Sequence, residues 1–185
     1  MSKRVFRAVA LGGMVVFIGV GALSVAGADA RTFSASPLNG YEENMDISTV
    51  ARGSFEATLS TDGTTLSYEV RFDGLEGTVT QSHIHFGKAA TNGGISIWLC
   101  QTAAAPAPAG TNPPTCPESG AVTGEVDSSD VVGPNGQGIE PGAFDEIIAA
   151  MRAGHTYVNV HSTKWPGGEI RAQINTTRSS DDSSR

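Results

Sequence analysis

Two short segments, far apart in the chain, carry three of its four histidines. His83 and His85 are two positions apart in a strand-like run, so both side chains leave the same face of a strand. His161 ends a second strand-like run. Imidazole is the commonest metal ligand among side chains, and three imidazoles with one open position suit copper or zinc. If the two strands are neighbours, these three histidines form a candidate metal site.

Two interpretations of this cluster stay open. Ring nitrogens that point at a common centre about 2 Å away would indicate a bound metal ion. Imidazoles that are hydrogen-bonded to backbone or carboxylate groups would indicate a structural role at one end of the fold. The fourth histidine, His155, begins its strand about 20 Å from His161, and we expect it to be exposed.

The acidic residues near these segments also allow two interpretations. Glu169 shares a face of the last strand-like run with Arg171. It is either a carboxylate that accepts a hydrogen bond from a ligand histidine and orients its ring, or half of a cross-strand ion pair of small energetic value. Glu42 and Glu43 are adjacent, and we expect both to be solvated loop residues. The sequence contains no nucleophile elbow, phosphate-binding loop or HExxH motif, so it predicts no catalytic constellation.

The elements that must position these residues are short alternating segments separated by turn residues, which predict an all-β fold. One segment differs, because apolar residues at spacings of three and four predict a short amphipathic helix from Pro141 to Ala153. We predict a Greek-key two-sheet β-sandwich of the immunoglobulin or superoxide-dismutase type, with one short helix. The predicted strands are Phe33 to Leu38, Gly53 to Leu59, Leu66 to Phe72, Val79 to Phe86, Ile95 to Cys100, Ala121 to Val126, His155 to His161 and Glu169 to Ile174.

The first 30 residues are predicted to be a secretory signal peptide. Lys3, Arg4 and Arg7 precede a mostly apolar, uncharged run, and Ala28 to Ala30 fits a cleavage site. The alternative is an uncleaved membrane anchor, since about 20 uncharged residues can span a bilayer. Residues 31–175 then form one domain, and residues 176–185 form a polar tail that we expect to be disordered.

Charge and cysteine content restrict the partners and the compartment. Cleavage after residue 30 changes the formal net charge from −7 to −9, which argues against nucleic acid and against anionic lipid as partners. Cys100 and Cys116 are the two cysteines, and export to an oxidising compartment predicts a disulfide between them.

Four segments of the chain together match a known pattern: Phe33 to Gly40, Thr78 to Gly87, Gly154 to Ser162 and Gly167 to Ile174. In these segments the chain resembles the CHRD domain, a module named after chordin that is also found alone in exported bacterial proteins. The resemblance spans about Thr32 to Asn175 and implies a fold and an extracytoplasmic location more than an activity. The family often has Glu-Val-Pro-Pro after the first strand, whereas this chain has Glu-Glu-Asn-Met at positions 42–45.

A more distant similarity is to the copper–zinc superoxide dismutases. That family also has a His-x-His strand and a late strand that ends in Val-x-His or Val-His. Its zinc-loop histidines and its metal-bridging histidine have no counterpart here, because no histidine lies between His85 and His155. The similarity therefore implies a reduced, copper-type site at most and argues against dismutase activity.

We therefore expect a secreted CHRD-domain protein that acts as a non-enzymatic binding or structural module, with a histidine cluster that binds a metal ion or orders one end of the fold. The alternative is a copper-type redox metalloprotein. A third hypothesis is a protein–protein interaction module, which predicts an exposed apolar patch of roughly several hundred Å². The expected partner is an extracellular or cell-envelope protein, with no nucleic acid and, after signal cleavage, no membrane.

Overall fold

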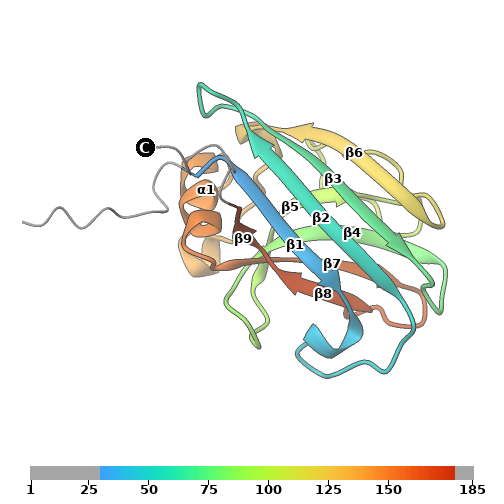
Figure 1. The fold of residues 1–185 in the computed structure, drawn as a ribbon. Coiled ribbons are helices and arrows are strands. Elements are labelled where there is room, and N and C mark those ends of the chain that lie inside the picture. The colour runs from blue at the N-terminus through green and yellow to red at the C-terminus, as the bar shows by residue number, and fades with distance from the viewer. Residues whose placement is uncertain (1–29, 178–185) are drawn as a thin grey trace, which may run out of the picture.

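Segments with alternating apolar side chains form two antiparallel sheets in the computed structural model, which describes residues 30–177 (Figure 1). The five-stranded sheet has the order β6-β3-β2-β1-β9, and the four-stranded sheet has the order β5-β4-β7-β8. The predicted all-β two-sheet sandwich is confirmed. The strands are β1 (Thr32–Leu38), β2 (Arg52–Leu59), β3 (Leu66–Asp73), β4 (Val79–Phe86), β5 (Gly94–Cys100), β6 (Gly120–Val126), β7 (Thr156–Ser162), β8 (Ile170–Gln173) and β9 (Asn175–Thr176).

The connections between the sheets follow a Greek-key pattern. Strands β3, β4 and β5 follow one another in the chain, and β6 then returns to pair with β3 in the first sheet. A fourth strand that returns to lie beside the first of three consecutive strands defines this motif. In the second sheet, β7 pairs with β4. The two strands that carry the histidine segments are therefore neighbours.

The core lies between the two sheets. Phe55 pairs with Val70 across β2 and β3, and Ile84 pairs with Ile97 on one side and Val158 on the other. All five side chains are fully buried. Burial of each contributes about 1.5–3 kcal/mol to folding. Because side chains alternate along a strand, the residues next to Ile84 and Val158 must lie on the outer face of the four-stranded sheet.

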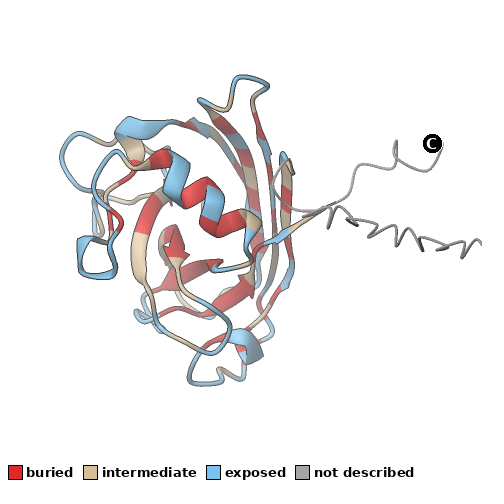
Figure 2. Cartoon of the chain, turned by 90° about the vertical axis from the view of Figure 1, so that its left-hand side faces the viewer, coloured by how far each residue is buried: buried red, intermediate tan, exposed pale blue. Residues whose placement is uncertain are grey.

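The helix α1 (Phe144–Arg152) lies at one end of the sandwich, near β7 and β9 (Figure 1). Its apolar face is buried and its opposite face is exposed, as the spacing of apolar residues predicted (Figure 2). It begins three residues after the predicted start at Pro141, because Gly142 has a left-handed backbone with φ +86°. Three short 3-10 helices were not predicted: η1 (Gly40–Glu42), η2 (Ser128–Asp130) and η3 (Asn135–Gln137).

The end of the described chain is paired rather than free. Strand β9 pairs with β1, and the backbone N–H of Thr177 donates to the carbonyl of Thr32 at 3.0 Å. The predicted disordered tail therefore begins too early, because residues 176 and 177 pair with β1. Residues 178–185 of the predicted tail and residues 1–29 of the predicted signal peptide lie outside the described residues. Within the described part of the chain, no helix is long and apolar enough to cross a membrane.

The predicted disulfide joins Cys100, at the end of β5, to Cys116 in the loop before β6. We expect a Cys100→Ser/Cys116→Ser variant to lose about 3 kcal/mol of unfolding free energy, because the bridge restricts a loop of about 15 residues in the unfolded chain. Urea unfolding of the oxidised protein beside the variant measures this loss. Reduced wild-type protein is the control and should match the variant. Equal stability of all three proteins would contradict the prediction.

Candidate metal centre

The pairing of β4 with β7 brings the three predicted histidines together. His83 pairs with Asn159, and Gln81 pairs with His161. Because Ile84 faces the core, His83 and His85 both face outward from the four-stranded sheet, and His161 faces the same way. One nitrogen of each ring lies within 4.8 Å of the others. In a tetrahedral site with bonds of about 2.0–2.1 Å, neighbouring ligand atoms lie about 3.3 Å apart. The three histidines could therefore hold one metal ion after small side-chain movements.

The histidines lie on an outer face but are not exposed. The relative exposures of His83, His85 and His161 are 0%, 8% and 6%. Two loops contact the rings: the β4–β5 loop, through the carbonyl of Gly93, and the β7–β8 loop, through the carbonyl of Pro166. The loops therefore shield the cluster from water.

The hydrogen bonds leave ring nitrogens available inside the cluster. His85 donates from Nδ1 to the carbonyl of Gly93 at 2.9 Å, and His161 donates from Nδ1 to the carbonyl of Pro166 at 3.0 Å. A carbonyl oxygen can only accept, so each Nδ1 carries the proton and each Nε2 carries a lone pair. Among the described residues, His85 Nε2 and both nitrogens of His83 have no hydrogen-bond partner. A metal-binding histidine usually has this arrangement, with one nitrogen held by a carbonyl and the other directed inward.

Burial keeps these histidines neutral. It lowers the pKa of His83 to about 2, and the neighbouring His161 and His85 rings act in the same direction. Burial also lowers the pKa of His85 to about 4 and is the main cause of the lowered pKa of His161. Neutral imidazole is the form that binds a metal, so the cluster needs no deprotonation near pH 7.

Aromatic side chains fix the orientation of two of the rings. Trp98 pairs with His83 across the strands and meets its ring edge-on, with ring centroids 4.2 Å apart. Tyr157 stacks in parallel on His85, with centroids 4.6 Å apart. On the same tyrosine ring, the guanidinium carbon of Arg171 lies 3.3 Å from the centroid. These contacts restrict the rotamers of His83 and His85.

Glu169 has hydrogen-bond partners that differ from both interpretations of the sequence. It is fully buried, and its carboxylate accepts from the hydroxyl groups of Thr49 and Ser162 and from the backbone N–H of Glu76. Within residues 30–177, it makes no hydrogen bond to a histidine and no ion pair with Arg171. It links the β1–β2 loop, the β3–β4 loop and the end of β7.

The expectation that Glu43 is solvated is wrong, whereas Glu42 is exposed as predicted. Glu43 is 9% exposed, and burial raises its pKa to about 7, against the opposing effects of the Arg171 charge and the Asn159 amide. Gly168, with φ +125°, permits this arrangement, because a Cβ at that position would clash with the Glu43 carboxylate and the Asn159 amide. Glu43 does lie in a loop, as expected, but paired backbone hydrogen bonds between Asn39 and Arg171 hold the start of this loop against β8.

The family comparison matches the CHRD domain over residues 34–174, which include the three clustered histidines and both cysteines. This protein belongs to the CHRD family. A comparison with curated proteins found no match, and neither did one with solved structures. The resemblance drawn from the histidine segments is therefore confirmed, whereas the distant similarity to superoxide dismutases stays a prediction.

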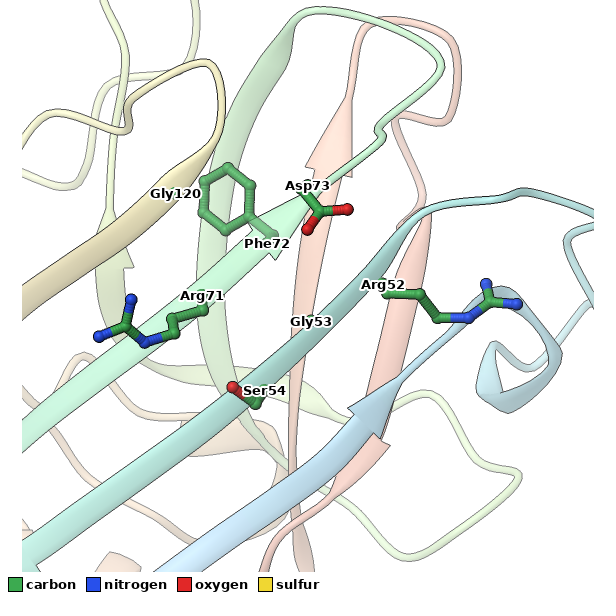
Figure 3. Close-up of a pocket in the computed structure, with 7 residues that line it drawn as sticks. All are labelled: Arg52, Gly53, Ser54, Arg71, Phe72, Asp73 and Gly120. Atoms are coloured by element: carbon green, nitrogen blue, oxygen red, sulfur yellow. The ribbon is translucent and has the colours of Figure 1, made fainter.

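Two further features lie away from this CHRD-domain histidine cluster. His155 is exposed, as predicted, and lies one residue before β7 rather than at its first position. On the five-stranded sheet, an open hollow of about 350 Å³ is lined in part by Arg52, Arg71 and Asp73 (Figure 3). Both arginines have partners already, because Arg52 donates to backbone carbonyls and Arg71 forms an ion pair with Glu69. We assign no function to this hollow.

Proposed function

We propose that this protein is an extracytoplasmic CHRD-domain module that binds one copper or zinc ion through His83, His85 and His161. The observation that carries the proposal is a set of unpaired ring nitrogens within the histidine cluster. Three ring nitrogens of His83 and His85 are buried without a hydrogen-bond partner among the described residues. An unsatisfied buried polar atom lowers the stability of the folded protein by about 1–3 kcal/mol. A bound ion that uses these lone pairs would reduce this loss of stability.

The chemistry of the donor set supports these two metals. Neutral imidazole suits copper and zinc, whereas calcium and magnesium prefer oxygen ligands. Such an ion would supply a fixed positive charge and, for copper, a change of oxidation state. The chain itself holds the His85 and His161 rings through the carbonyls of Gly93 and Pro166 and excludes water through its loops.

We propose a binding or structural role rather than catalysis, because a substrate must reach a catalytic metal and these imidazoles are buried. The alternative is a copper-type redox role, which electron transfer without substrate contact would permit. The half-buried ring of Trp98 against His83 favours that alternative, since it lies between the cluster and the surface. Reduction of the copper-loaded protein by ascorbate, followed by reoxidation in air without loss of copper, would support it.

The proposed location and partner rest on other features. The disulfide is typical of an oxidising compartment and supports export. The expected partner is an extracellular or cell-envelope protein. Tyr41, Met45 and Val50 are large exposed apolar residues of the β1–β2 loop, with exposures of 64%, 83% and 76%, and they are the surface that would contact such a partner.

Metal analysis of the protein purified from an oxidising compartment tests the proposed site. We expect about one equivalent of copper or zinc in the wild type. The His83→Ala/His85→Ala variant should bind none, because it keeps one ligand of three. His155→Ala removes an exposed histidine outside the cluster and should bind the metal normally. Circular dichroism of all three proteins checks their folding.

Two results would contradict the proposed metal site. One is a wild type that is purified without metal and takes up neither added copper nor added zinc. The other is an equal loss of metal in the His155→Ala control, which would show that binding does not depend on the cluster.

A further inference from the structure

Asn159 lies among the three histidines although its residue type gave no signal for a metal site. It pairs with His83 across β4 and β7, precedes His161 by two residues, and is 2% exposed. Its side-chain Oδ1 lies 3.0 Å from Nε2 of His161. Asn159 therefore directs a polar oxygen into the cluster.

The contact between Asn159 and His161 lies where a metal ion would bind. The Nδ1 atom of His161 donates to the carbonyl of Pro166, so Nε2 is the nitrogen through which this ring would bind an ion. Asn159 Oδ1 faces that nitrogen at 3.0 Å. An ion held by Nε2 would therefore lie beside this oxygen.

The other side of the Asn159 amide lies beside Gly168. The Nδ2 atom of Asn159 and the Glu43 carboxyl group lie on the same side of this glycine. A Cβ at position 168 would meet both groups, so glycine leaves room for the amide with its Oδ1 toward the histidines.

We infer that Asn159 Oδ1 is the fourth protein ligand of the ion bound by His83, His85 and His161. This inference rests on the proposed function, because it assumes a metal in the cluster. Ligand atoms of a tetrahedral site lie about 3.3 Å apart. The 3.0 Å between Asn159 Oδ1 and His161 Nε2 is close to that separation.

A fourth protein ligand changes what the site is for. Closed four-ligand sites retain a metal, whereas catalytic sites keep one position for water or substrate. Three imidazoles with one amide oxygen also suit zinc or Cu(II) better than Cu(I), which prefers sulfur ligands. The inference therefore favours metal retention over catalysis.

Cobalt(II), which gives visible bands that report coordination number, is the probe for the test. Wild-type protein should bind one Co(II) with the intense bands of a four-coordinate ion, and azide should leave the spectrum unchanged. Asn159→Ala should bind Co(II) at least about 10-fold more weakly. Azide should change the spectrum of this variant, because water then occupies the fourth position. Asn159→Asp keeps an oxygen ligand and should resemble the wild type.

The outcomes separate the inference from the proposed function. A wild type that binds one Co(II) but responds to azide, or an Asn159→Ala variant with the wild-type spectrum, overturns the fourth ligand alone. A wild type that binds no Co(II), copper or zinc overturns both, and stoichiometry reveals this before any spectra are compared. A purely structural role of Asn159 would weaken folding in both variants without creating an azide-sensitive position. That result also overturns the inference.

Discussion

Glu169→Gln is expected to lower the free energy of unfolding by about 3 kcal/mol, although within residues 30–177 Glu169 makes no hydrogen bond to the clustered histidines. The fully buried carboxylate accepts three hydrogen bonds, from Thr49 and the backbone of Glu76 at 2.8 Å and from Ser162 at 2.5 Å. Glutamine keeps one acceptor oxygen and places an N–H₂ group against donors. Hydrogen bonds to a charged group contribute roughly 1.5–3 kcal/mol each, so losing even one of them has a large effect.

Urea unfolding at pH 7 measures this effect, with Glu42→Gln as the matched control. Glu42 is exposed, and its replacement should change stability by less than about 0.5 kcal/mol. Metal content should be measured on the same samples. A Glu169→Gln protein with wild-type stability but less bound metal would contradict the structural role. It would instead support the role suggested by the sequence, in which Glu169 orients a ligand histidine.

The alternation of side chains explains why much of this site was visible in the sequence. His83, Ile84 and His85 alternate on one strand, so a buried isoleucine requires both histidines to face the other way. The same parity places His161 outward once β7 pairs with β4. The strands were predicted within one or two residues for the same reason, except β9, which has two residues and therefore no period to detect.

The remaining parts of the site depend on contacts that periodicity does not encode. Glu43 is buried because the loop after β1 folds back, held by paired backbone hydrogen bonds between Asn39 and Arg171. The carbonyls that orient His85 and His161 belong to the backbone and leave no trace in side-chain motifs. Asn159 is an ordinary polar residue in a strand until the positions of its neighbours are known. These features follow from loop conformation, which the spacing of residue types along the sequence does not reveal.

Acidification from pH 7 to pH 5 is expected to destabilise the metal-free protein. The pKa values of His83 and His85 fall from 6.5 to about 2 and about 4 on folding. The unfolded chain therefore binds protons below pH 6.5 while the folded protein does not. The stability that these two residues contribute is complete above pH 6.5 and declines as the pH falls. Together they account for a loss on the order of 4 kcal/mol at pH 5.

Glu43 opposes this trend. Its pKa rises from 4.5 to about 7 on folding, so its contribution is complete below pH 4.5 and declines as the pH rises toward 7. Between pH 7 and pH 5 it returns on the order of 2 kcal/mol, which leaves a net loss of about 2 kcal/mol for the wild type. Glu43→Gln removes this opposing term, and the variant should lose about 4 kcal/mol over the same range.

Urea unfolding of both proteins at several pH values, in the presence of a chelator, measures the two slopes. A steeper loss in Glu43→Gln is the decisive result, because it requires buried neutral histidines and a buried carboxyl that act in opposite directions. Glu42→Gln, at an exposed position, should follow the wild type. Equal slopes in wild type and Glu43→Gln would show that Glu43 is solvated after all. A flat profile in both would show that the histidines are accessible to protons in the folded protein, which a buried cluster does not permit.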